Sequence, residues 1–443
     1  MNTHATSQFA LLRQRRFAPF FWTQFAGAAN DNLFKFAFTV LVTYQLQISW
    51  LPPALAGLVI GALFIAPFVL FSATAGQLCD RLEKTRVIRA VKNLEIAIMA
   101  VAALAFVIDA PDLQAGLLLA CTFLMGLHST LFGPVKYALL PQVLAERELV
   151  GGNALVESGT FVAILLGNLT GGLLIALPGV GREAVAVGCL ALALLGRWSA
   201  QAMAPLPAAD PDLRINWNPW SETRANLRLA RQDGVSWQML LGISWLWFFG
   251  AVFLSQFPVL AKEVLHGNEQ VASLLLVVFS LGIGAGSLLC ERLSRGQVEI
   301  ALVPLGALGM SVFTLDFWWA VRSLPAAELM GVAAFLSQAA HWRVLLDLGL
   351  LSLSAGLFSV PMYALIQVRS QASHRSRIIA ANNILNALFM VASALISAAL
   401  LMAGVSLPAL FLCLALGNLM MLVWLCLRVP EMPRRAWQWL RLG

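Results

Sequence analysis

Polar and charged side chains interrupt an apolar run near the N-terminus, in the stretch QFAGAANDNLFKFAF. Asp31 and Lys35 stand four residues apart and Gln24 precedes Asp31 by seven, so a helix places all three on one face. Asp31 and Lys35 are expected to pair along that helix, which lowers the cost of burying either charge. We predict that this face binds a charged group or an ion. Its residues are Gln24, Asn30, Asp31, Asn32 and Lys35.

Two later stretches repeat the pattern of ionisable side chains within apolar sequence. GLHSTLFGPVKYALLPQ carries His128, Phe132 and Lys136 four residues apart, and GGNALVESGTFVAILLGN carries Asn153 and Glu157 on one side of a helix. We predict that these groups converge with the first cluster on one site carrying both signs of charge. The alternative is that they only pair with one another and hold a bundle together. Added to the first cluster, the predicted binding residues are His128, Phe132, Lys136, Asn153, Glu157 and Gln256.

The composition predicts an all-α integral membrane protein. Of 443 residues, 60% are hydrophobic and 12% are charged, whereas soluble domains have about a quarter charged residues. Twelve windows are long and apolar enough to span a bilayer, which takes roughly 20 residues. A charge buried there is costly, so the polar face of the first window is expected to look into protein or water. The windows are 17–45, 54–79, 88–108, 113–135, 154–177, 185–204, 237–260, 270–290, 299–321, 347–368, 379–402 and 407–428.

The distribution of cations predicts that both termini are cytoplasmic. Cytoplasmic loops hold an excess of Lys and Arg, and with the N-terminus inside most of the 29 basic residues lie in such loops. The net charge of +7 then reflects the topology. The basic residues are scattered over membrane-adjacent loops, which argues against nucleic-acid binding. The other cations are Lys35 and Lys136 at membrane depth and Arg182, Lys262, Arg322 and Arg343 in outer loops.

The longest polar break divides six windows from six. We predict an N-terminal bundle (1–204), a cytoplasmic linker (205–236) and a C-terminal bundle with a tail (237–443), the linker holding a short amphipathic helix capped by Ser221. CDRLEKTR follows the second window and CERLSRGQ follows the eighth. A match at the same place in each half predicts two pseudo-symmetric six-helix bundles.

GQLCDRLEKTR, which begins at Gly76, resembles the G-x-x-x-D-R-x-x-(K/R) signature of the major facilitator superfamily. The resemblance implies a secondary transporter in which the acidic residue of this loop meets helix ends and basic side chains and holds the outward-open state. The alternative is that the charges only anchor a loop at the lipid surface. The predicted gate residues are Gly76, Asp80, Arg81, Lys84, Arg86, Glu291, Arg292 and Arg295.

Three stretches are similar to the lysophospholipid transporter family, including its segments fused to acyltransferase and acyl-carrier-protein synthetase domains. They are TQFAGAANDNLFKFA from Thr23, LHSTLFGPVKYALLPQ from Leu127 and VGGNALVESGTFVAILLGN from Val150. The resemblance implies a flippase of the bacterial inner membrane that moves lysophospholipids, such as lysophosphatidylethanolamine, to the cytoplasmic leaflet for reacylation. A polar N-terminal half and a largely apolar C-terminal half suit an amphiphile with a charged head.

The same resemblance implies that Asp31, Lys136 and Glu157 bind the head group or a coupling ion, either Na⁺ or H⁺. It also implies a separate acyltransferase/acyl-carrier-protein synthetase as a partner. We expect a monomer surrounded by membrane lipids. The coupling ion, the head-group and acyl-chain preferences and the role of residues 322–346 stay open.

No enzymatic activity is predicted, because His341 and Asp347 are six apart and no histidine has the His-x-x-x-x-Asp spacing of an acyltransferase. No phosphate loop and no metal-ligand spacing occur, so neither a cofactor nor a metal is expected. Two alternatives remain. One is a proton-linked exporter of drugs or another small amphipathic solute, with Asp31 and Glu157 titrating. The other is a non-transporting membrane scaffold or receptor that recruits an acyltransferase.

Overall fold

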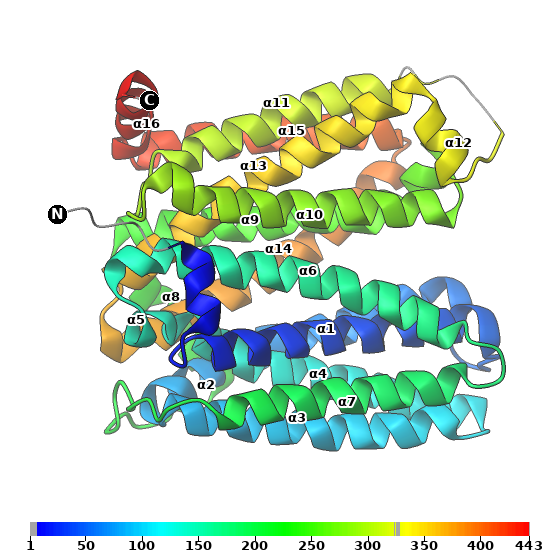
Figure 1. The fold of residues 1–443 in the computed structure, drawn as a ribbon, viewed down its shortest axis with the longest axis horizontal. Helices are drawn as coiled ribbons and strands as arrows, with labels where there is room; N and C mark the ends of the chain where they lie inside the picture. Colours follow the sequence, from blue (N-terminus) through cyan, green and yellow to red (C-terminus); the bar gives the residue numbers. More distant parts are fainter. Residues whose placement is uncertain (1–6, 323, 325–327, 443) are drawn as a thin grey trace. The chain divides into compact units, whose positions relative to one another are not determined.

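The computed structural model describes residues 7–322, 324 and 328–442, and this part of the chain is almost entirely helical (Figure 1). Hydrogen bonding within each helix satisfies the backbone, as a bilayer interior demands. The long helices are α1 (Ala18–Val40), α2 (Pro53–Arg81), α3 (Lys84–Val107), α4 (Pro111–Ala138), α6 (Leu149–Ile175), α7 (Gly181–Gln201), α9 (Gly234–Val259), α10 (Glu269–Ser294), α11 (Leu302–Arg322), α13 (Ala339–Arg369), α14 (Arg375–Met402) and α15 (Leu407–Arg428). The short ones are α5 (Leu140–Val143), α8 (Pro219–Ala230), α12 (Val332–Ser337) and α16 (Glu431–Leu442).

The predicted all-α membrane fold is confirmed. Within the described residues, 11 helices are long and apolar enough to cross a membrane. The helix α1, which forms from the first predicted window, falls outside this set because its polar side chains lower its mean hydropathy. With α1, every predicted window corresponds to a long helix. The cytoplasmic location of the termini stays a prediction.

The helix of the linker begins earlier than predicted. Its N-cap is Asn218, whose side chain accepts hydrogen bonds from the backbone N–H groups of Trp220 and Ser221. Pro219 then occupies the first helical position, where a missing N–H costs nothing. The expectation that Ser221 caps this helix was therefore wrong. Residues 322–346 contain α12 and the start of α13, although 323 and 325–327 lie outside the described residues.

The next helix boundary is fixed by an ion pair. Asp233 caps α9 by accepting from the backbone N–H of Ser236. Its two oxygens also accept from Arg369, the last residue of α13, at 2.7 and 2.8 Å. The hydrogen bonds from the Arg369 guanidinium hold the pKa of Asp233 well below its usual range.

The chain forms two compact units. Unit 1 comprises the described residues up to Ala145, Val162–Gln232 and Ser370–Ala387, and unit 2 comprises the rest. The helices α6 and α14 each contribute one segment to both units. The division into 1–204, 205–236 and 237–443 stays a prediction.

Within unit 1, α2 packs against α4, and α7 packs against both α1 and α3. Figure 1 shows α3 and α7 side by side. Within unit 2, α13 packs against α10 and α11. Because α7 packs against both α1 and α3, and α1 also contacts α4, the polar residues of α1 lie near those of α3 and α4.

The α10–α13 pair yields a stability prediction. A Cβ at Gly286 would lie 1.9 Å from the backbone oxygen of Leu353, whereas a Cβ at Gly116 on α4 meets nothing within 4 Å. Gly286→Ala should lower the free energy of unfolding by about 1–3 kcal/mol. Gly116→Ala, the matched control, should raise stability by up to about 1 kcal/mol, since alanine favours helix. Thermal unfolding in detergent micelles measures both, and equal midpoints would contradict the close approach.

Candidate functional site

A buried carboxylate on α3 organises the polar face of α1. Glu95 is completely inaccessible to solvent. Asn30 donates from Nδ2 to Glu95 Oε1 at 2.7 Å, and Lys92 donates from Nζ to Oε2 at 2.6 Å. The ammonium group fits there because α1 has Gly27 beside it, where a Cβ would lie 2.5 Å from Lys92 Nζ. Glu95 thus ties α1 to α3.

The helix α4 connects the same carboxylate to Asp31. His128 Nε2 lies 3.3 Å from Glu95 Oε2. The next residue, Ser129, donates from Oγ to Asp31 Oδ2 at 2.6 Å and lies 3.5 Å from His128 Nδ1. A continuous polar path therefore runs from Lys92 through Glu95, His128 and Ser129 to Asp31.

One oxygen of Asp31 has no hydrogen-bond partner among the described residues. Among the described residues, Oδ1 of Asp31 is buried without a hydrogen-bond partner, while Oδ2 accepts from Ser129. A carboxylate accepts several hydrogen bonds, and a buried oxygen that accepts none is costly. This oxygen could take an ammonium group, a proton or a small cation.

The expected ion pair between Asp31 and Lys35 is not among the contacts of the described residues. Lys35 Nζ lies instead over the Phe64 ring of α2, 3.8 Å from the ring centroid. The reason is that Ser129 offers Asp31 a short hydrogen bond from α4, while the aromatic face of Phe64 attracts the ammonium group. Lys35 still contributes a positive charge near Asp31.

The structure places the other predicted residues of unit 1 in varied surroundings. Gln24 is buried. Asn32 donates to the backbone oxygen of Ala28 at 2.8 Å. The ring of Phe132 has Lys92 Nζ 5.3 Å from its centroid, and Lys136 Nζ lies 5.3 Å from the ring centroid of Tyr137. Phe132 therefore borders the buried network.

Three predicted residues lie in unit 2. Asn153 exchanges two hydrogen bonds with Gln367 of α13, at 2.7 and 3.0 Å. Glu157 is buried on α6, the helix that carries Asn153. Gln256 of α9 donates to Ser255 at 3.3 Å. The convergence of these residues with Asp31 stays a prediction.

A second polar cluster lies at the end of α2, inside unit 1. The buried Asp80 accepts from the backbone N–H groups of Ser376 and Arg377 at 3.1 and 3.3 Å, and from Arg377 Nε at 3.2 Å. These N–H groups belong to the first turn of α14, where they have no partner within the helix. Gly76 permits the approach, since a Cβ there would lie 2.7 Å from Ala380 Cβ. Asp80, which belongs to α2, therefore caps the N-terminus of α14.

The linker reinforces this contact. The backbone oxygen of Asp80 accepts from the N–H groups of Ala209 and Asp210, and Asp210 lies 3.5 Å from Arg377 Nη2. Gln77 exchanges two hydrogen bonds with the backbone of Asn216, at 3.0 and 2.7 Å. The linker is thereby attached to the end of α2.

The remaining predicted gate residues differ between the two repeated motifs. Lys84 is buried, whereas Arg81 and Arg86 are exposed and Arg86 pairs with Glu83 at 2.8 Å. At the end of α10, Glu291 is half-buried and Arg292 and Arg295 are exposed. Arg295 adopts the left-handed conformation that ends α10. The equivalent cysteines, Cys79 and Cys290, are both fully buried.

Sequence reasoning missed Lys92 and Glu95. It assigned Lys92 to the cations of the cytoplasmic side, although the residue is only 1% exposed. The available signal was an oppositely charged pair three residues apart inside the window 88–108, a spacing that brings side chains together on a helix. Ser129 was missed because a serine in an apolar helix usually bonds its own backbone.

Comparison with known proteins confirms the sequence resemblance. Residues 20–340 match the family model described as Major Facilitator Superfamily. The chain is 28% identical over 356 residues to the lysophospholipid transporter LplT of Serratia proteamaculans, covering 79% of each chain. It is also 28% identical over 357 residues to LplT of Escherichia coli, again covering 79% of each.

Solved transporters share the fold. The human organic anion transporter MFSD10 gives a TM-score of 0.70 at 15% identity, covering 92% of this chain and 99% of that one. The fucose:proton symporter FucP of E. coli gives 0.65 at 15% identity, covering 93% and 98%. At these identities the likeness concerns the fold alone.

The network predicts a large effect of neutralising Glu95. Glu95→Gln leaves Lys92 buried without its counter-charge and should lower the free energy of unfolding by about 3–5 kcal/mol. Thermal unfolding in detergent micelles measures the loss. Glu431→Gln is the control, because Glu431 is exposed and pairs with Arg435 on the surface of α16. Equal small shifts for both variants would show that the buried pair contributes nothing special.

Proposed function

Because the chain belongs to the Major Facilitator Superfamily, we propose that this multi-pass membrane protein is a lysophospholipid transporter of the bacterial inner membrane. It moves lysophospholipids such as lysophosphatidylethanolamine to the cytoplasmic leaflet by alternating access. The observation that carries the proposal is the similarity to LplT proteins over 79% of both chains. The relatives and the structural neighbours are transporters, which agrees with transport and not catalysis.

Asp31 is the proposed site of recognition on α1. Its unpartnered Oδ1 would accept from the ammonium group of an ethanolamine head or bind the coupling Na⁺ or H⁺. Lys35 and Lys136 supply positive charge for a phosphate. The network through Ser129 and Glu95 fixes the carboxylate, so the site is pre-organised before substrate arrives.

Asp80 is the proposed gate. Its contact with the first turn of α14 combines hydrogen bonds, an ion pair and the positive end of a helix dipole. A contact of this kind can be broken as a unit, and it favours whichever conformation contains it. On the predicted topology it lies on the cytoplasmic side, so it would hold that side closed until substrate binds.

The transported lysolipid becomes the substrate of a separate acyltransferase/acyl-carrier-protein synthetase in this proposal. A lysophospholipid lacks one acyl chain. Reacylation restores that chain and so lowers the amount of lysophospholipid in the cytoplasmic leaflet. Continued consumption there would keep the gradient directed inward even with weak ion coupling.

Transport by purified protein in proteoliposomes tests the function. A fluorescent lysophosphatidylethanolamine should flip to the inner leaflet at a rate that empty liposomes do not reach, while the diacyl lipid should not. Asp31→Asn should slow flipping by about tenfold or more, because it removes the charge of the proposed binding oxygen. The exposed Asp109→Asn is the control and should transport normally.

The same preparation separates the alternatives. Imposing a Na⁺ gradient and a pH gradient in turn identifies the coupling ion. Export of a cationic dye without lysolipid flipping would favour the proton-linked exporter. Failure to move either class of molecule would favour the scaffold. Wild-type flipping by Asp31→Asn under both gradients would remove Asp31 from the mechanism.

The gate yields its own expectation. Asp80→Asn should insert and fold normally yet flip lysolipid about tenfold more slowly, because an amide has one acceptor oxygen in place of two and carries no charge to pair with Arg377. Flipping rates are compared at equal protein content in the liposomes. Asp212→Asn, an exposed linker position, is the control. Unaltered transport by Asp80→Asn would eliminate the gate role.

A further inference from the structure

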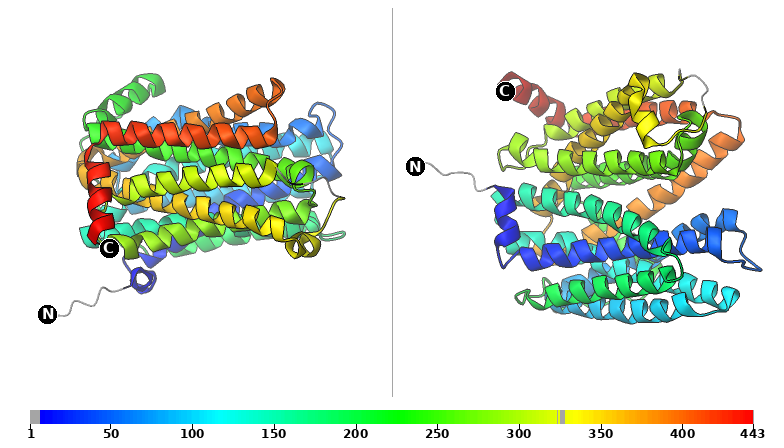
Figure 2. Two further views of the ribbon diagram at one scale, coloured as in Figure 1. Left: turned by 90° about the horizontal axis from the view of Figure 1, so that it is seen from above. Right: turned by 45° about the vertical axis from the view of Figure 1, so that its right-hand side comes forward.

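The helix α16 follows α15 after a sharp turn and has three distinct faces. Figures 1 and 2 show it running across the end of α15 and not along it. Met432 and Ala436 are buried on the inner face, and Trp439 on the same face donates from Nε1 to the backbone oxygen of Leu293 at 3.3 Å. This anchoring fixes α16 to unit 2.

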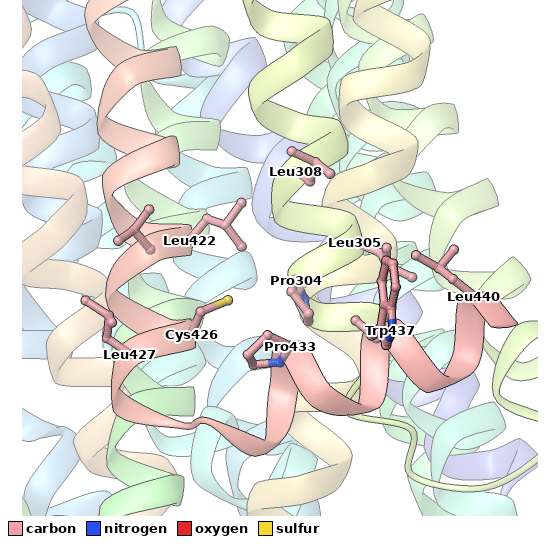
Figure 3. Close-up of a pocket in the computed structure, with 11 residues that line it drawn as sticks. Pro304, Leu305, Leu308, Leu422, Cys426, Leu427, Pro433, Trp437 and Leu440 are labelled. Atoms are coloured by element: carbon pink, nitrogen blue, oxygen red, sulfur yellow. The ribbon is translucent and has the colours of Figure 1, made fainter.

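A second face of α16 is apolar and lines a groove. The groove has a volume of about 360 Å³ and lies between α11, α15 and α16. Figure 3 shows Trp437 and Leu440 of α16 beside Leu305 of α11, with Leu308 and Cys426 farther along the groove. Its volume is within the range of about 300–1,000 Å³ that small-molecule sites occupy.

The third face of α16 is basic. Arg434, Arg435 and Arg441 are exposed, and one acidic residue, Glu431, lies near Arg435 at 3.7 Å. The guanidinium carbon of Arg441 lies 4.7 Å from the ring centroid of Trp437, which itself lines the groove. Positive charge therefore stands at the rim of an apolar groove.

We propose that this groove binds an anionic phospholipid of the surrounding leaflet. One acyl chain lies along α11 and α15 in the groove, and the phosphate lies among the arginines of α16. A basic amphipathic helix of this kind suits the membrane interface, where its apolar face meets acyl chains and its cations meet anionic heads. The excess of arginine over acid on α16 distinguishes this occupant from a zwitterionic lipid, and Trp437 suits the boundary between the two regions.

The lipid site shares no residue with the proposed transport site. It therefore goes beyond the proposed function and does not depend on it. Binding is measured without any gradient or flipping. Failure of lysolipid transport leaves the proposal standing, and failure of lipid retention leaves transport standing.

Native mass spectrometry of the full chain in detergent tests the head-group contact. With equal amounts of phosphatidylglycerol and phosphatidylcholine of the same chains, the protein should retain one phosphatidylglycerol. The variant Arg434→Gln/Arg435→Gln/Arg441→Gln should retain it about tenfold less. Arg224→Gln/Arg228→Gln, which removes exposed charge from α8, should retain it normally. Equal retention of both lipids, or normal retention by the triple variant, would overturn the proposal.

A second variant tests the acyl-chain contact. Leu308→Trp adds bulk to a half-exposed position inside the groove. It should lower the retention of phosphatidylglycerol about tenfold even though every arginine is present. An unchanged unfolding temperature in lipid-free detergent separates this effect from misfolding. Normal retention of phosphatidylglycerol by Leu308→Trp would overturn the placement of the acyl chain in the groove. A dimer that buries Trp437 and excludes phosphatidylglycerol would replace the lipid with a second copy.

Discussion

The cost of burying charge in an apolar interior governs the arrangement of unit 1. Glu95 is inaccessible to solvent and would be intolerable there alone, so Lys92, His128 and Asn30 surround it. These partners come from three helices, so satisfying the carboxylate requires α1, α3 and α4 to approach one another at this point. The electrostatic requirement therefore acts as a positional constraint on α1, and through Ser129 on Asp31 as well.

Asp80 meets the same cost in a different way. It lies at a helix end, where the N–H groups of α14 have no partner of their own, and both sides of the contact are satisfied together. The partner of Asp80, Arg377, is partly exposed, so water can replace this contact when the helix ends separate, whereas Lys92, the partner of Glu95, is itself buried. One buried carboxylate is thus suited to holding helices permanently, and the other to a contact that opens and closes.

The sequence revealed charges that stand out from their surroundings. Asp31 interrupts an apolar window, and Asp80 lies in a recognisable motif, so both were selected from the sequence as candidate functional residues. Glu95 was missed because Lys92, three residues before it, was counted among the cytoplasmic cations although both lie inside the window 88–108. The pairing of Asp31 with Ser129 depends on how α1 packs against α4, which spacing within one helix does not contain. The cap of α8 was misplaced by three residues because serine and asparagine cap helices about equally well.

Environment, more than residue type, separates the roles of the charged groups. Lys92 is enclosed beside Gly27 and Glu95, where a single fixed geometry satisfies it. Arg377 is partly exposed and binds Asp80, Asp210 and a backbone oxygen, so its contacts can be exchanged for water one at a time. The arginines of α16 are exposed, which leaves their charge accessible to the anion that we propose for this surface. A fixed centre, an exchangeable contact and an exposed basic surface thus follow from how far each cation is buried.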